Sequence, residues 1–308
     1  MNMNKIKTKL RYFLLGIMLL LSPNANTTDN EVTLAQKGAN FDLQILQAGY
    51  DNEIDVDLGC ITSSCLGYAK ADNLSLRIIQ KDQKNDVYFS LDGDNNDIFI
   101  YQEGPGQNSF GWTDLWGAVN CGSSTWCGDI DGDNNTVKIQ QIHDGSNSET
   151  NLIGVHIWGS NNELDLGQGC HYTSGSDTTC DIDDHQDGGH RIVIDVHASN
   201  LDLQGSQDSG ANYANHTADL RWYGADNNDV FFRQRGNGAK TLTLLVYSDN
   251  NDISIEQKSD GAHTAAITIY GSQPTTLNLL QKSGSATSYS LSQNCNTSGG
   301  CSVSVTQE

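Results

Sequence analysis

A seven-residue pattern of alternating polar and apolar positions recurs along the chain. It has the form Asn-x-Φ-x-Φ-x-Gln, in which Φ is an apolar residue. Full copies begin at Asn96, Asn135, Asn162, Asn228 and Asn251, and copies that lack the Asn end at Gln47, Gln80 and Gln281. Because side chains alternate between the two faces of a strand, the Asn, both apolar residues and the Gln share one face. The pattern therefore predicts β-strands that carry amides on their core side.

A second alternating segment follows most copies after a short stretch rich in Gly, Ser or Asp, as in Val87-Phe89-Leu91. The spacing between successive glutamines is 22 residues from Gln80 to Gln102 and 24 residues from Gln257 to Gln281. Two short strands and two tight turns fill such a unit and leave no room for a helix. We expect an all-β fold, a parallel two-sided β-solenoid of about 9–10 coils with strand–turn–strand repeats of 22–24 residues. An antiparallel meander with exposed amides is the alternative.

Stacked coils would place identical amides one above another, where they can form hydrogen-bonded ladders. A buried amide without partners would cost roughly 1–3 kcal/mol, so amides in every copy favour such stacking. The candidate ladder and self-assembly residues are Asn96, Gln102, Asn135, Gln141, Asn162, Gln168, Asn228, Gln234, Asn251, Gln257 and Gln281. The open rows at the end coils, near Gln47 and Gln281, would offer a template to which another subunit adds by strand pairing.

The N-terminus has the pattern of an export signal. Four basic residues between Lys5 and Arg11 precede an apolar run from Tyr12 to Leu21, which is too short to span a bilayer. We expect residues 1–25 to be a signal peptide, with a retained membrane anchor as the alternative. Residues 26–37 are expected to be a flexible segment, and residues 38–308 a single solenoid domain.

Eight cysteines fall into four close pairs, which in an exported chain favours disulfides over metal thiolates. The expected local bridges are Cys60–Cys65, Cys121–Cys127, Cys170–Cys180 and Cys295–Cys301. They would close loops inserted into the solenoid at residues 59–66, 120–128, 170–190 and 294–302, because the longer gaps between glutamines contain the cysteines. A zinc site built from Cys170, His171, Cys180, His185 and His190 is the alternative, although the spacing matches no zinc motif. Residues 170–225 fit the repeat poorly and are expected to form degenerate coils with a decorated loop.

The charge balance excludes one class of partner. Lys and Arg number 17 against 38 Asp and Glu, a net charge of −21 that falls to −25 without the four basic residues of the leader. A protein that binds nucleic acid through its phosphates is not expected at this charge. The acidic turns at residues 92–97 and 129–134 could bind Ca²⁺, but Asp, Asn and Gly are also the residues that tight turns require. We favour the structural interpretation and expect no obligatory cofactor.

Catalytic signals are weak. Acidic pairs such as Asp183 with Asp187 could act as acid and base in sugar cleavage, but nothing singles one pair out among so many acidic turns. No nucleophile motif accompanies the eight histidines, which we expect mostly on the surface, and we expect no enzymatic activity. The tryptophans are expected to cap the thin core or to pack beneath the cysteine loops, and sugar stacking is the alternative; they are Trp112, Trp116, Trp126, Trp158 and Trp222.

The paired-strand unit resembles the curlin repeat of bacterial curli fibre subunits. The resemblance rests on Gln-x-Gly, or a close variant, at the end of the first strand, with an Asn shortly after. The best matches are Gln47 to Asn52, Gln102 to Gly104 and Gln234 to Asn237, and the resemblance covers roughly residues 38–169 and 226–293. It implies a secreted β-solenoid that stacks end to end into amyloid fibres for adhesion and the biofilm matrix. The implied partners are further copies or related curlin-like subunits, and an outer-membrane secretion apparatus.

This chain departs from the curlin pattern in its four cysteine loops and in the scarcity of second-strand glutamines, to which Gln293 and Gln307 are assigned as exceptions. It could be a fibre subunit or a minor, nucleating subunit. From a different class, it could be a monomeric secreted module that binds calcium or surface polysaccharide.

Overall fold

The structure is a computed structural model of the 308-residue chain. It describes residues 18–20, 30–59, 70–104, 108–111, 128–143, 150–169, 189–208, 215–223, 226–236, 239–247, 249–258, 262–271, 275–282, 287–295 and 301–308. Within these ranges the chain consists of strands and turns, and no helix is long and apolar enough to cross a membrane.

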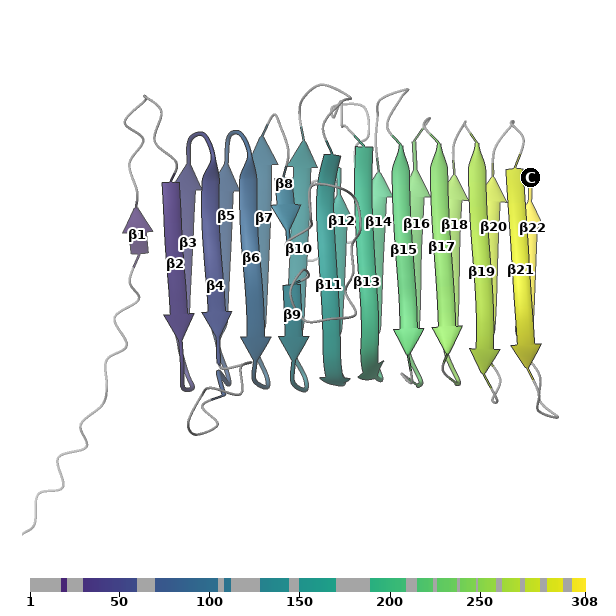
Figure 1. Ribbon diagram of the computed structural model, residues 1–308, viewed down its shortest axis with the longest axis horizontal. Helices are drawn as coiled ribbons and strands as arrows, with labels where there is room; N and C mark the ends of the chain where they lie inside the picture. Colours follow the sequence, from purple (N-terminus) through teal and green to yellow (C-terminus); the bar gives the residue numbers. More distant parts are fainter. Residues whose placement is uncertain are drawn as a thin grey trace, which may run out of the picture.

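The strands form two parallel sheets that face each other across the core (Figure 1). The first sheet has the order β1-β3-β5-β7-β10-β12-β14-β16-β18-β20-β22. Its strands are β1 (Met18–Leu20), β3 (Asp42–Ala48), β5 (Ser75–Lys81), β7 (Asp97–Gly104), β10 (Thr136–His143), β12 (Glu163–Gln168), β14 (Asp202–Asp208), β16 (Asp229–Arg235), β18 (Asp252–Lys258), β20 (Thr276–Lys282) and β22 (Ser302–Gln307).

The second sheet has the order β2-β4-β6-β8-β11-β13-β15-β17-β19-β21, with β9 paired to both β6 and β11. Its strands are β2 (Asn30–Gln36), β4 (Asn52–Leu58), β6 (Asn85–Asp92), β8 (Asn108–Phe110), β9 (Gly128–Asp131), β11 (Thr150–Ser160), β13 (Gly189–Ser199), β15 (His216–Tyr223), β17 (Lys240–Tyr247), β19 (His263–Gly271) and β21 (Thr287–Cys295). Apart from β8 and β9, which share one strand position of the second sheet, successive strands alternate between the sheets, so each coil contributes one strand position to each sheet. The predicted parallel two-sided β-solenoid is confirmed, and the antiparallel meander is wrong.

The core lies between the sheets and follows the alternation of the sequence. In β4 every second residue is buried, and Ile54, Val56 and Leu58 are at most 1% exposed. Each coil adds only a few apolar side chains, but parallel pairing stacks them into continuous rows along the solenoid. A chain with 36% hydrophobic residues can therefore still bury a core.

The turns that lead into the first sheet use a left-handed Asn. Asn95, Asn134 and Asn161 have φ of 57–58°, a conformation that Asn tolerates better than most residues. Each donates its backbone N–H to a carbonyl of the next coil at 3.0 Å. The turns therefore stack in the same parallel register as the strands.

Four predicted boundaries need correction. Asn294 and Cys295, assigned to the fourth loop, end β21, and Ser302 begins β22. Asn30–Gln36, expected within a flexible segment, form β2 and pair with β4 along their whole length. The second loop interrupts a strand position of the second sheet: β8 and β9 pair with successive parts of β6, on either side of the insertion between them. In the third, Gly189 and His190 already belong to β13, because their backbone pairs with Thr150 and Asn151.

Candidate functional site

One row of glutamines runs through the first sheet from β3 to β22. Its members are Gln47, Gln80, Gln102, Gln141, Gln168, Gln207, Gln234, Gln257, Gln281 and Gln307. The Nε2 atom of each glutamine after the first donates to Oε1 of the preceding one at 2.7–3.0 Å. The predicted ladder geometry is thus present, and all members except Gln307 are fully buried.

The same amide groups also join the two sheets. Nε2 of Gln102 donates to the carbonyls of Asn85 and Ser109 at 2.9 Å, and Nε2 of Gln257 donates to the carbonyl of Thr264 at 3.2 Å. A glutamine at this position therefore satisfies backbone acceptors where the chain turns from one sheet to the other. This explains why an amide occupies a core position in every coil.

Two members of the row escaped the sequence analysis. Gln207 lies in the region that fits the repeat poorly, because Gly205 stands where the second apolar residue is expected. A Cβ on Gly205 would lie 2.4 Å from Cδ2 of Phe232, so the ring of the next coil fills that space. Gln307, assigned to a second strand, belongs to β22 of the first sheet and pairs in register with Gln281.

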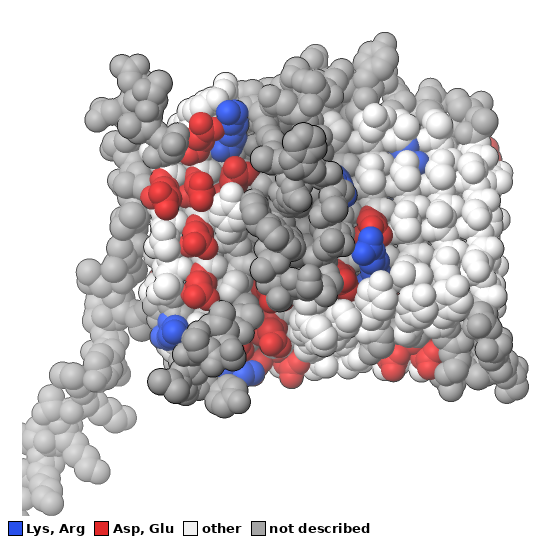
Figure 2. All heavy atoms as spheres, in the orientation of Figure 1, with Lys and Arg blue, Asp and Glu red and all other residues white. Residues whose placement is uncertain are grey.

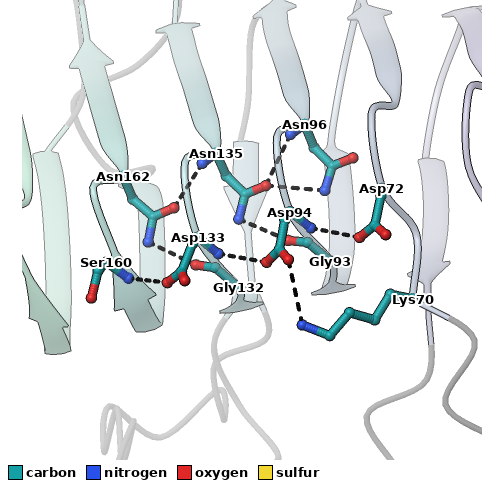
Figure 3. A network of polar contacts seen from close by, with 10 residues as sticks. All are labelled: Lys70, Asp72, Gly93, Asp94, Asn96, Gly132, Asp133, Asn135, Ser160 and Asn162. Atoms are coloured by element: carbon teal, nitrogen blue, oxygen red, sulfur yellow. Dashed lines mark hydrogen bonds and ion pairs between the residues drawn. The ribbon is translucent and has the colours of Figure 1, made fainter.

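The asparagine row of the first sheet is less uniform than predicted. Nδ2 of Asn96 donates to Oδ1 of Asn135 at 3.0 Å, and Asn228 donates to Asn251 at 3.1 Å. Nδ2 of Asn135 instead donates to the carbonyl of Gly93, while Oδ1 of Asn162 accepts the backbone N–H of Asn135 (Figure 3). The asparagine side chains of this row therefore form hydrogen bonds with the backbone of the turns as well as with one another.

The acidic turns form a similar backbone network. Oδ1 of Asp72 accepts the backbone N–H of Asp94, and Oδ1 of Asp94 accepts that of Asp133, at 2.9 and 2.8 Å (Figure 3). Oδ1 of Asp133 accepts the backbone N–H of Ser160 at 2.5 Å. These carboxylates already have donors from the neighbouring coil, which favours a structural role for the turns over calcium binding.

A third buried row, at the start of each strand of the second sheet, was not predicted. In the N-terminal half it is an asparagine ladder with Nδ2–Oδ1 distances of 2.8–3.5 Å: Asn30, Asn52, Asn85, Asn108 and Asn151. From β13 onward the same register carries His190, His216, Lys240 and His263, all at most 1% exposed. The expectation that histidines lie mostly on the surface is therefore wrong for these three, and also for His156, which is buried on β11. The Asn after each Gln-x-Gly was the only signal for this row.

Burial sets the protonation of this row. The rings of His190 and His216 are stacked with centroids 5.0 Å apart. Desolvation lowers the pKa of His216 well below its ordinary value, and the neighbouring His190 and Lys240 lower it further. His216 is consequently neutral at physiological pH.

The outer face of the second sheet changes character along the solenoid. Acidic residues gather over the strands nearer the N-terminus, and uncharged residues cover most of the C-terminal strands (Figure 2). On β4 the outward residues are Glu53, Asp55 and Asp57, whereas β17 presents Thr241 and Thr243. The described part of this face thus combines an acidic half with a largely neutral half.

A line of stacked rings crosses the same outer face. Its successive centroids are 4.2–5.6 Å apart, with planes within 19° of parallel: Trp158, His197, Tyr223, Tyr247 and Tyr270. Trp158 is the first ring of this line and is 44% exposed, so the expectation that it caps the core is wrong. The stack covers one face of Trp158, and sugar stacking on it stays an alternative. Trp222 lies in the core at 1% exposure, as expected.

Other predicted residues lie outside the described part of the chain. They are Cys60, Cys65, Cys121, Cys127, Cys170, Cys180, His171, His185, Asp183, Asp187, Trp112, Trp116 and Trp126. Cys295 ends β21, and Cys301 is disulfide-bonded, while the four pairings stay predictions.

Both ends of the solenoid leave core residues partly open. Val32 and Leu34 at the first coil, and Val303 and Val305 at the last, pack against the core but are only partly buried.

No family model, curated protein or solved structure matches the chain. The functional interpretation therefore rests on the rows and on these two ends.

Proposed function

We propose that this protein is a secreted structural protein, a curlin-like subunit or a minor, nucleating component of extracellular amyloid fibres in adhesion and the biofilm matrix. Its partners are further copies of itself or related curlin-like subunits, after export through an outer-membrane secretion apparatus. The fold presents a parallel, in-register arrangement within one chain, in which like side chains already stack at the spacing of a cross-β fibre.

The observation that carries this proposal is the direction of the glutamine row. At the first coil, Nε2 of Gln47 donates to the backbone carbonyls of Asn30 and Glu53, but no described glutamine precedes it. At the last coil, Nε2 of Gln307 donates to Gln281, and no described residue donates to its Oε1. The row thus begins with a donor and ends with an acceptor, so a second copy could extend it head to tail.

The open core supports the same mode of association. Val303 and Val305 would be covered if the first coil of another copy stacked on β22. Backbone groups on the outer edges of β21 and β22 would then gain partners as well. Burial of the apolar ends and completion of the backbone pairs would both favour lengthening.

The test introduces a charge into the open end. In Val305→Lys the new ammonium lies in the core row, whereas in the matched variant Thr306→Lys it lies on the exposed side of the same strand. We expect wild-type protein starting at residue 26 to form filaments that bind an amyloid dye. Thr306→Lys should behave similarly, and Val305→Lys should grow slowly or not at all.

Sedimentation and electron microscopy read out filament growth independently of the dye. Persistent wild-type monomers without filaments would contradict the proposal and favour a monomeric binding module. Equal growth of the two lysine variants would show that filaments do not lengthen through β22.

A further inference from the structure

Two histidines and an aspartate form a cluster on the outer face of the second sheet. The parallel register of β11 and β13 places His156 beside Asp195 and Trp158 beside His197. One potential ligand atom from each of His156, Asp195 and His197 lies within 4.8 Å of the others. We propose that these three residues bind a divalent transition-metal ion, for which Zn²⁺ is the appropriate probe.

Asp195 is the ligand whose surroundings best suit a cation. It is 2% exposed, and among the described residues its Oδ1 accepts no hydrogen bond, although Nε2 of His197 lies 3.3 Å away. A buried carboxylate oxygen without a donor is costly, and a metal ion would satisfy it. Arg221 is the register neighbour of Asp195 on β15, but its guanidinium forms a two-point ion pair with Asp219.

His156 is held by a second carboxylate. Its Nδ1 lies 3.0 Å from Oδ1 of Asp129, the neighbouring residue on β9. Nε1 of Trp158 also lies 3.2 Å from this Nδ1 and can only donate, so the tautomer of His156 decides which of the two contacts forms. In the tautomer that donates its Nδ1 proton to Asp129, the lone pair of His156 is on Nε2. Metal-binding histidines commonly have such a carboxylate partner, which fixes the tautomer and increases the basicity of the ligand.

His197 is oriented by its aromatic neighbours. Its ring stacks on Trp158 with a centroid distance of 4.2 Å and an interplanar angle of 8°, and Tyr223 stacks on the other side at 5.4 Å. The rigid sheet and the stack thus hold this ligand in position without a metal.

The donor set indicates the class of metal. Two imidazoles and one carboxylate suit Zn²⁺ and similar transition metals, whereas Ca²⁺ prefers six to eight oxygens. Bonds of about 2.0–2.1 Å in tetrahedral geometry require ligand atoms about 3.4 Å apart, a spacing that small side-chain rotations can reach from the present one. Three protein ligands would leave a fourth position for water or a partner.

The experiment measures Zn²⁺ binding to untagged protein by calorimetry, with the visible absorption of Co²⁺ as a second readout of ligand geometry. We expect binding at this site to weaken at least tenfold in Asp195→Asn and in His197→Gln. Asp86→Asn is the control, because Asp86 is a partly buried aspartate on the same outer face that is hydrogen-bonded to Ser109. Its affinity should equal that of the wild type.

Circular dichroism establishes that each variant is folded, and the partly exposed His197 provides a test that disturbs the packing less than Asp195 does. The absence of Zn²⁺ binding by the wild type would overturn the proposal. So would equal Zn²⁺ affinity and equal Co²⁺ spectra in the wild type and all three variants.

Discussion

A glutamine in the core of this protein makes sense only because its neighbours are glutamines. Gln257 donates to Gln234 at 2.8 Å and to the carbonyl of Thr264 at 3.2 Å, and it accepts from Gln281 at 2.7 Å. The three bonds form in a buried environment, where an amide that lacks one pays for its lost hydration. The stability of each coil is therefore coupled to the next.

Gln257→Leu should destabilise the fold although leucine is the more apolar residue. The substitution removes the donor to Gln234 and Thr264 and the acceptor of Gln281, so we expect a loss on the order of 1–3 kcal/mol. Glu256→Gln is the control, since the side chain of Glu256 pairs with Lys258 on the outer face and should contribute less than about 1 kcal/mol. Thermal and denaturant unfolding measure the stability of both variants. Equal stability of the two variants would mean that the row contributes nothing.

At the scale of single elements, strands β13, β15, β17 and β19 begin with a buried basic side chain where earlier strands begin with Asn. Asparagine side chains do not titrate, so the stability of an asparagine ladder does not depend on pH, whereas an imidazole changes its protonation with pH. The folded pKa of His216 is well below the ordinary 6.5 because desolvation penalises its charged form. The unfolded state therefore binds more protons than the folded state once the pH falls below about 6.5.

This difference in proton binding predicts that His216, on β15, makes the folded state less stable in acid. The contribution of His216 is complete above pH 6.5 and is lost as the pH falls below it, by at most about 1.4 kcal/mol per pH unit. In His216→Asn, which restores the residue type of the N-terminal half, the decline between pH 7.5 and pH 5 should be shallower. Denaturant midpoints across that range measure it. Parallel curves for the two proteins would show that His216 does not titrate on unfolding.

The strands that could be predicted are those whose core positions are filled from their own sequence. In β7, Ile98, Ile100 and Gln102 fill the inward positions, so alternation alone identifies the strand. In β14 the inward Gly205 leaves its space to Phe232 of β16, and the local pattern fails although the register continues. Packing between coils cannot be read from one coil's sequence.

At the scale of the whole molecule, insertions decide which outward residues meet. His156 and Asp195 are neighbours in space but 39 residues apart in sequence, and the intervening insertion obscures their register. The inward rows of the first sheet were predictable because most of its strands repeat the same residues, whereas the outward residues differ from strand to strand. The cluster on β11 and β13 therefore became visible only when the strands were placed side by side.

At the N-terminal end of the solenoid, a short strand covers the edge of the first sheet. Met18–Leu20, within the predicted signal peptide, form β1 and pair with Gln44–Leu46 of β3. This short strand occupies the backbone edge that an incoming β22 would need under the proposed mode of growth. Removal of residues 1–25 would therefore open one end of the first sheet.

A chain that starts at residue 26 should form fibres with a shorter lag than the full chain, because the edge of β3 is then free for strand pairing. Shorter length and lower hydrophobicity could have a similar effect, so Leu19→Pro in the full chain is the control. Proline restricts the backbone and removes an N–H, which should disrupt β1 while keeping the leader. The proline variant should then approach the lag of the truncated chain in sedimentation assays and electron microscopy. If the full chain and the proline variant assemble at the same rate, β1 does not limit access to the edge of β3.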